Sequence, residues 1–251
     1  MTEEALFKSR MCDLSREAYD GGYYTASQFL TLSEQADLAR LATDGIIGSY
    51  TLDGGFEGAE RRLALFGDAA LFGYDPIPPT TWLAITPTAP KFADTLSHRD
   101  FLGTLMGLGI KRELFGDILI VKNVGYLYLL ESIAPYVIEN LTRTKHTEVK
   151  AALVDAPPST AIKLPEITLV VTAGERLDAV IAAVYKLSRQ EAQAFIERGL
   201  CALDGRVVEK PATSLKSGVT VSLRGKGRFR YEGIDSDTRK GKLRIAVRIF
   251  L

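Results

Sequence analysis

The stretch that decides the fold is RLDAVIAAVYKLSRQEAQAFIERG, residues 176–199. Apolar residues recur in it at i, i+3, i+4 and i+7, which predicts a first helix with one buried face. They are Leu177, Val180, Ile181 and Val184. Ser188 to Glu191 then reads as a capping box, in which each residue's side chain accepts from the other's backbone amide. Gly199 stands where a left-handed C-terminal cap is needed, so the stretch predicts two short helices in succession.

The exposed side of the second helix carries Arg189 and Gln193, which are four residues apart. A cation in the first turn of a helix opposes the helix dipole and costs a few tenths of a kcal/mol up to about 1 kcal/mol. Stability alone therefore favours an acid at this position. Because the same exposed amides attract anions, a bound phosphate would explain Arg189.

The residues after the two helices predict a small sheet. Asp204-Gly205 lies between apolar runs and predicts a hairpin turn, because both residues tolerate a positive φ. Residues 219–223 and 243–249 alternate apolar and other side chains, as half-buried strands do. This mixture of helices and strands places the region, residues 165–251, in the α+β class.

The run RGKGRFRY, residues 224–231, is the most basic part of the chain. In an extended chain the period of two would place four cations on one face. These are Arg224, Lys226, Arg228 and Arg230. The two glycines would let the backbone approach a ligand closely. We expect an anion opposite this face, although a solvated basic strand is the alternative.

Charge is divided unevenly along the chain, although the total is zero. Residues 171–251 carry 16 Lys and Arg against 9 Asp and Glu, a net charge of +7. Residues 1–170 carry 15 against 22, a net charge of −7. A basic end beside an acidic one suggests a polyanionic partner, with chance segregation of surface charge as the alternative.

The first 158 residues predict two further domains. Residues 1–75 read as two helices, Glu3 to Tyr19 and Ser27 to Leu41, and a hairpin between Gly48 and Gly67. Prolines in residues 75–79 suggest a boundary. Residues 76–158 then follow the strand-helix-strand-strand-helix-strand order of the split βαβ, or ferredoxin-like, fold, which RNA-recognition modules share. The tyrosines Tyr126 and Tyr128 would either stack bases or cover a face of that sheet.

Several classes of protein are excluded. Cys12 and Cys201 lie far apart and no CxxC pair exists, so we expect no metal and no cofactor in a reducing cytoplasm. The acidic start predicts no secretory signal, and the longest apolar stretch, residues 101–110, is too short for a membrane span. No P-loop, GxSxG elbow or dinucleotide fingerprint occurs, so we expect a protein without enzymatic activity.

Residues 176–178, 187–189, 199, 204–206 and 218 resemble the S-four domain, an RNA-binding module of two helices over a small bent sheet. The positions that match its RNA-contacting residues are Arg176, Ser188, Arg189, Gln193 and Arg198, with further contacts expected from Arg206 and Lys210. The chain departs from the usual pattern at Asp204, where asparagine is commoner, and at Val219, where aspartate often follows the glycine.

Residues 54–62 and 105–118 resemble characteristic segments of the bacterial YlmH family, whose members carry an S-four domain. The resemblance implies a monomeric RNA-binding protein that contacts ribosomal RNA on the large ribosomal subunit in ribosome-associated quality control, with tRNA as a second candidate partner. Lys111 and Arg112 are candidates for a second RNA contact, although a surface turn with salt bridges is the alternative. A regulatory factor that binds protein through its acidic part, for instance in cell division, is the alternative function.

Overall fold

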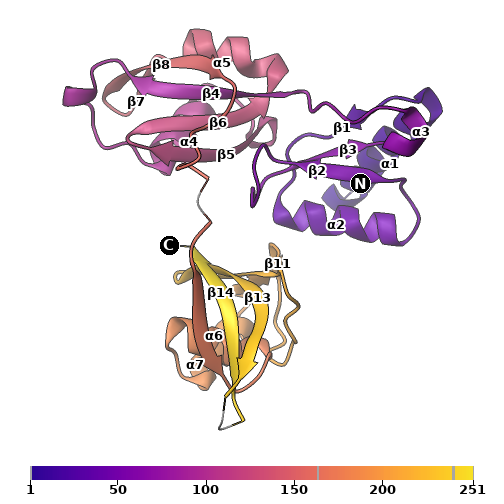
Figure 1. Cartoon of the computed structure of the whole chain (residues 1–251), viewed down its shortest axis with the longest axis vertical. Helices are drawn as coiled ribbons and strands as arrows, with labels where there is room; N and C mark the ends of the chain where they lie inside the picture. Colours follow the sequence, from indigo (N-terminus) through magenta and orange to yellow (C-terminus); the bar gives the residue numbers. More distant parts are fainter. Residues whose placement is uncertain (1, 163, 239–240, 251) are drawn as a thin grey trace. The chain divides into compact units, whose positions relative to one another are not determined.

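The computed structural model describes residues 2–162, 164–238 and 241–250, and the chain forms two compact units, residues 1–163 and 164–251. Figure 1 shows the first unit in indigo to salmon and the second in orange to yellow. Both units mix helices with antiparallel sheets, so the predicted α+β class is confirmed. The predicted boundary after residue 75 falls inside the first unit, and the chain divides between residues 163 and 164, shortly before the predicted start of the third domain at residue 165.

The first unit begins with a small helical subdomain, residues 3–72. Its helices are α1 (Glu3–Gly21), α2 (Leu32–Thr43) and α3 (Ala69–Phe72), and its strands are β1 (Thr25–Ala26), β2 (Tyr50–Asp53) and β3 (Leu63–Phe66), in the order β1-β3-β2. The second helix begins five residues later than predicted. Thr31 caps it, with Glu34 completing the capping box, while Leu30 pairs with Arg62 in an isolated β-bridge.

The predicted ferredoxin-like order is present in the rest of this unit. Its strands are β4 (Thr80–Pro87), β5 (Phe115–Val121), β6 (Val124–Leu130), β7 (Arg143–Thr144) and β8 (Thr147–Val154), in the order β5-β6-β4-β8-β7. Its helices are α4 (His98–Gly107) and α5 (Ala134–Asn140), with short 3₁₀ turns η1 (Pro90–Phe92), η2 (Arg112–Leu114) and η3 (Glu131–Ile133). Phe101, Leu105 and Val137 of the helices pack on one face of this sheet.

The other face of this sheet is covered by the N-terminal subdomain. Trp82 and Tyr128 form one apolar cluster with Phe29, Leu63 and Leu65. Since successive side chains of a strand point to opposite sides, β3 contacts this sheet on one side and the helical core of the subdomain on the other. All four residues of β3 are buried. The two parts of the first unit therefore share a core.

This packing decides between the two interpretations of the tyrosines. Tyr128 is 6% exposed, stacks edge-on against Phe29 and donates to the Asp53 carboxylate over 2.7 Å. Tyr126 packs against the same cluster and is half-buried. Burial, followed by the hydrogen bond to Asp53, raises the pKa of Tyr128. These rings cover a sheet face, and the buried Tyr128 is not available to stack bases.

The second unit contains two helices and a six-stranded antiparallel sheet. The helices are α6 (Leu177–Tyr185) and α7 (Arg189–Glu197). The strands are β9 (Ile167–Thr172), β10 (Cys201–Leu203), β11 (Arg206–Val207), β12 (Thr220–Leu223), β13 (Gly227–Asp237) and β14 (Leu243–Phe250), in the order β11-β10-β12-β13-β14-β9. Strand β9, which was not predicted from the sequence, pairs with β14 at the edge of the sheet.

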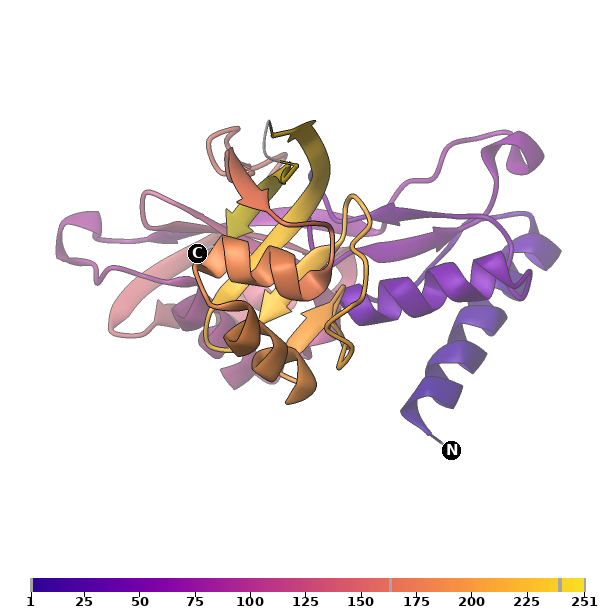
Figure 2. The same ribbon diagram turned by 90° about the horizontal axis from the view of Figure 1, so that it is seen from below.

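Both helices of this unit cover one face of its sheet, as Figure 2 shows from below. Leu177, Val180, Ile181, Ala192 and Ile196 of the helices pack on Val221, Phe229, Tyr231, Ile245 and Val247 of the strands. The predicted turn is present at Asp204 and Gly205, with φ values of 46° and 79°, and Gly199 has the predicted positive φ of 66°. Among the described residues, no helix is both long and apolar enough to cross a membrane.

We expect Phe29→Ala to lower the free energy of unfolding of the first unit by about 3–5 kcal/mol, because the ring is 1% exposed in the shared core. Trp82, the single tryptophan of the sequence, lies in the same cluster and reports its unfolding by fluorescence in urea. Phe92→Ala is the matched control, since Phe92 is 91% exposed. Equal midpoints for the two variants would show that the two parts of the unit do not share a core.

Candidate nucleic-acid interface

The buried carboxylate of Asp178 lies at the centre of the predicted RNA-contacting residues. Its side chain is 0% exposed, in the first turn of α6. Arg176 donates to both oxygens over 3.2 and 3.1 Å, Arg189 donates over 3.1 and 3.4 Å, and Gln193 donates over 2.8 Å. The backbone amide of Ala179 adds a bond of 2.9 Å. One carboxylate therefore holds three predicted contact residues together.

This network leaves positive charge at the surface. The side chains of Arg176 and Arg189 are 47% and 50% exposed, while the single carboxylate that they share is buried. Burial alone raises the pKa of Asp178, but the hydrogen bonds from Arg176, Arg189 and Gln193 outweigh it and hold the pKa well below its usual range. Two cations against one anion give a fixed net charge of +1.

Asp178 also provides a structural reason for Arg189. From the sequence we interpreted Arg189, a cation at the start of α7, as the partner of a bound phosphate. In the structure the buried Asp178 carboxylate already supplies a counter-charge for it. The contact of Asp178 with Gln193, fifteen residues later, was not predicted from the sequence. The sequence did offer one signal for this contact. Asp178 is an acid among apolar neighbours, and a carboxylate that is buried with them needs hydrogen-bond donors.

The start of α7 has the predicted capping box. The Ser188 amide donates to Glu191 over 2.7 Å, and the Glu191 amide donates to the serine hydroxyl over 3.1 Å. These bonds with Ser188 lower the pKa of Glu191, and the nearby charge of Lys226 lowers it further. Lys226 thus lies close to the end of the helix that carries Ser188 and Arg189.

The prediction of a continuous basic strand from Arg224 to Arg230 is wrong. Arg224, Gly225 and Lys226 form the turn between β12 and β13, and the strand begins at Gly227. Gly225 and Gly227 have φ values of 79° and 108°, so the alternation of extended chain does not hold through them. The Arg224 amide donates to the Leu200 carbonyl over 2.9 Å, which ties the turn to the segment after α7.

Arg228 and Arg230 lie on the face of the sheet opposite the helices. Their neighbours Phe229 and Tyr231 are buried under α6 and α7, and adjacent side chains of a strand point to opposite faces. The four cations predicted to share one surface are therefore divided. Lys226 lies near the start of α7, whereas Arg228 and Arg230 lie across the sheet.

The remaining predicted contacts lie at the margins of this unit. Arg198 is exposed at the C-terminal cap of α7. Arg206 is half-buried in β11, next to the predicted turn, and Lys210 is exposed in the loop after that strand. None of the hydrogen bonds described for the Asp178 carboxylate comes from these three residues.

Arg112, proposed with Lys111 as a second RNA contact, is occupied within the first unit. It donates to the carbonyls of Phe115 and Gly116 over 2.7 and 2.9 Å, and its guanidinium lies 4.4 Å from the centre of the Phe115 ring. Burial, with Arg61 nearby, lowers the pKa of Arg112 to about 10. Lys111 is exposed. Arg112 thus fixes its own turn, and Lys111 keeps a side chain available for a ligand.

The two segments that resemble the YlmH family meet in the structure. The amides of Glu60 and Arg61, from residues 54–62, donate to the carboxylate of Asp117, from residues 105–118, over 2.6 and 3.4 Å. The Phe29 amide also donates to the Glu113 carbonyl over 2.9 Å. These segments therefore join the helical subdomain to the ferredoxin-like sheet.

Comparisons with known proteins agree with this architecture. A family model described as “Putative RNA-binding domain in YlmH” matches residues 83–156, and the S4 (S-four) domain matches residues 175–221. The ribosome-associated protein quality control protein P2 of Bacillus subtilis (strain 168) is 30% identical over 226 residues, which are 87% of this chain and 84% of that protein. The chain belongs to the YlmH family. The predicted resemblance is confirmed.

A solved structure is also similar to this YlmH-family chain. It is the cell division protein ylmH from Streptococcus pneumoniae, with a TM-score of 0.49 and 21% sequence identity, covering 65% of this chain and 96% of that chain. The two matched families are RNA-binding domains.

Within the part of the chain that the structure describes, no group of three or more His, Cys, Asp or Glu is placed to hold a metal ion.

Asp178→Asn in this YlmH-family protein should lower the free energy of unfolding of the second unit by about 3 kcal/mol. This is the lower end for breaking a buried ion pair, because both arginines are half-exposed. Urea unfolding followed by circular dichroism measures the change. Asp235→Asn is the matched control, because Asp235 is exposed. A loss of the same size in both variants would contradict the role of Asp178.

The contribution of Asp178 should also depend on pH. Its pKa is lowered in the folded protein, so its stabilising effect is fully present above the unfolded pKa of about 3.9. The effect is lost as the pH falls through the lower pKa of the folded state. We expect the difference in unfolding free energy between wild type and Asp178→Asn to be constant near neutral pH and to shrink below about pH 4. A difference that grows in acid would contradict this.

Proposed function

We propose that this protein binds folded RNA through the helical surface of its S4 domain, which we define as Arg176, Ser188, Arg189, Gln193, Arg198 and Lys226. The observation that carries the proposal is the buried Asp178 carboxylate, which holds two half-exposed guanidinium groups and one amide in place before any ligand arrives. Groups fixed in advance lose less conformational entropy on binding. Guanidinium groups also match phosphate oxygens in pairs.

Phosphates supply the affinity in this proposal, and the shape of the RNA supplies the selectivity. The helical surface carries arginines and an amide but no aromatic ring, which suits a backbone more than splayed-out bases. Arg206 and Lys210, beside the Asp204 turn, extend the contact along the RNA. Lys111 of the first unit, within the matched YlmH domain, is the candidate for a second contact, whereas Arg112 supports it from within.

The partner that we propose is ribosomal RNA of the large subunit, with tRNA held beside it, in the quality control of stalled translation in the cytoplasm. The support for this finer statement is the family membership and the name of the Bacillus subtilis relative, which describes a ribosome-associated quality control protein. In this function the protein acts as a monomeric adaptor without catalysis.

Arg198→Glu and Arg189→Gln should reduce co-sedimentation of the protein with large ribosomal subunits. Arg198 is exposed at a helix end, so its charge reversal leaves the core untouched. Glutamine suits position 189 better than glutamate, because a second carboxylate beside buried Asp178 would destabilise the fold. Lys8→Glu on α1 is the matched charge reversal, since Lys8 is exposed in the N-terminal subdomain. The proposal would be contradicted if all three variants co-sedimented with large ribosomal subunits to the same extent as the wild-type protein.

The affinity for RNA should fall steeply with salt. If about four to six phosphates are neutralised, the logarithm of affinity falls against the logarithm of salt concentration with a slope of roughly −3 to −5. Filter binding of large-subunit RNA measures it. Arg198→Glu should flatten the slope by about one, whereas Lys8→Glu should not change it. A flat response in wild type would rule out a phosphate-dominated contact.

A further inference from the structure

The open face of the S4-domain sheet, opposite α6 and α7, carries a second group of cations. Arg230 lies beside Arg248 across β13 and β14, and Arg228 lies beside Phe250 in the same pair of strands. The Glu232 carboxylate lies 2.8 Å from Arg248 and 3.7 Å from Arg230, so these two arginines share one acid. Arg228 adds a third guanidinium group to this face.

A row of side chains crosses five strands of this open face. The register pairs Val207 with Ala202, Ala202 with Ser222, Ser222 with Arg228, and Arg228 with Phe250. At one end of the row the Arg228 guanidinium stacks 5.2 Å from the centre of the Phe250 ring. Aromatic rings and guanidinium planes are the groups on which unpaired bases stack.

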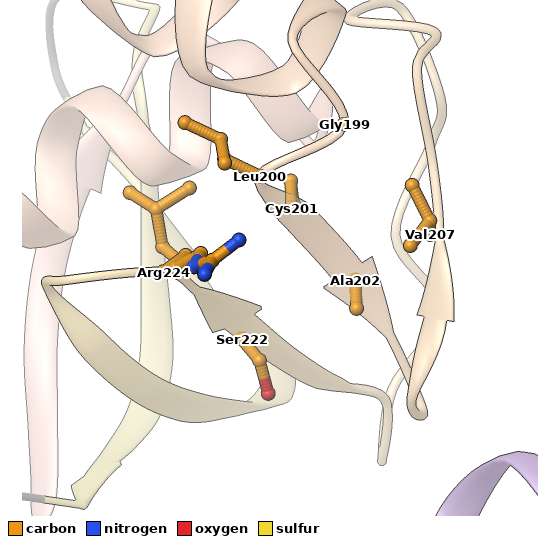
Figure 3. A pocket seen from close by; sticks show the side chains of 8 residues that line it. Gly199, Leu200, Cys201, Ala202, Val207, Ser222 and Arg224 are labelled. Atoms are coloured by element: carbon orange, nitrogen blue, oxygen red, sulfur yellow. The ribbon is translucent and has the colours of Figure 1, made fainter.

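At the other end of the row the surface is hollowed. A groove of about 270 Å³ runs over Ala202, Val207 and Ser222, and Figure 3 shows the side chains of Leu200 and Arg224 at its margin. The groove combines an apolar lining with one hydroxyl and one guanidinium. This suits a flat polar ring beside a phosphate. Arg224 places a further guanidinium group beside the groove.

These features favour a single strand over a duplex. A duplex would offer its phosphates to the arginines but would leave the Phe250 ring and the apolar groove without a partner, because its bases are already stacked. A single strand can place phosphates on Arg224 and Arg230 while its bases stack along the row. The exposed apolar side chains of Ile167, Leu169 and Val171 extend the same face along β9.

We infer that the open face of this sheet binds an unpaired segment of the RNA whose folded part contacts the helical surface. The inference rests on the proposed function and adds a second, chemically different contact to it. It also assigns a role to Arg228 and Arg230, which lie on the face of the sheet opposite the helices.

The test uses the full chain and three synthetic RNA probes in filter binding: a short hairpin, the same hairpin with a 3′ run of unpaired uridines, and the uridine run alone. We expect the tail to tighten binding to wild type at least about fivefold, the effect of one stacked base. Phe250→Ala and Arg228→Glu should remove this gain and leave the affinity for the blunt hairpin unchanged. Arg189→Gln should weaken binding of both hairpins and keep the gain.

The three probes separate this inference from the proposed function. Wild type that fails to bind the blunt hairpin but binds the uridine run would contradict the helical contact and support the sheet contact. A blunt hairpin that binds while the tail adds nothing would overturn the inference alone. The inference also fails if the sheet variants keep the gain from the tail but no longer sediment with ribosomes, since the face would then be bound by a protein. Lys8→Glu serves again as the charge control.

Discussion

A single buried carboxylate determines how the RNA-binding unit presents its charge. Asp178 cannot lose its negative charge cheaply, because two guanidinium groups and an amide surround it, and it cannot reach water, because the helices enclose it. The two arginines are therefore held at fixed positions from α6 and α7, at the cost of burying one charge. A more stable apolar residue at position 178 would leave those side chains free to move. The arrangement exchanges stability for a surface that is ready to bind.

Local patterns in the sequence were sufficient for most of the fold. The capping box at Ser188, the turn at Asp204 and the spacing of α6 each involve residues within a few positions of one another, so propensity and geometry agree. The basic run failed for the opposite reason. Period-two alternation assumes extended backbone, and the positive φ values of Gly225 and Gly227 reverse the chain within the run. Glycine permits a positive φ but does not require it, so the turn could not be predicted from the glycines alone.

Contacts between residues far apart in the chain could not be predicted from the sequence. Nothing near Tyr128 indicates that Phe29, ninety-nine residues earlier, covers its ring, and nothing near Arg112 shows that two carbonyls occupy its guanidinium. The convergence on Asp178 was half visible, since the pairing with Arg176 is local but the contacts with Arg189 and Gln193 need the folded helices. The division of the cations between two faces of the sheet follows from strand register, which a single sequence does not specify.

The burial of β3 on both sides has a practical meaning for dissecting the protein. The family match at residues 83–156 invites an experimenter to excise that segment, yet doing so would omit Trp82 and remove the cover from Tyr128, which leaves an apolar, aggregation-prone sheet face exposed. Cutting near residue 163 instead separates the chain where its two units divide. If the fragment of residues 83–156 proved insoluble, the cause would be its disrupted core. The result would say nothing about its affinity for RNA.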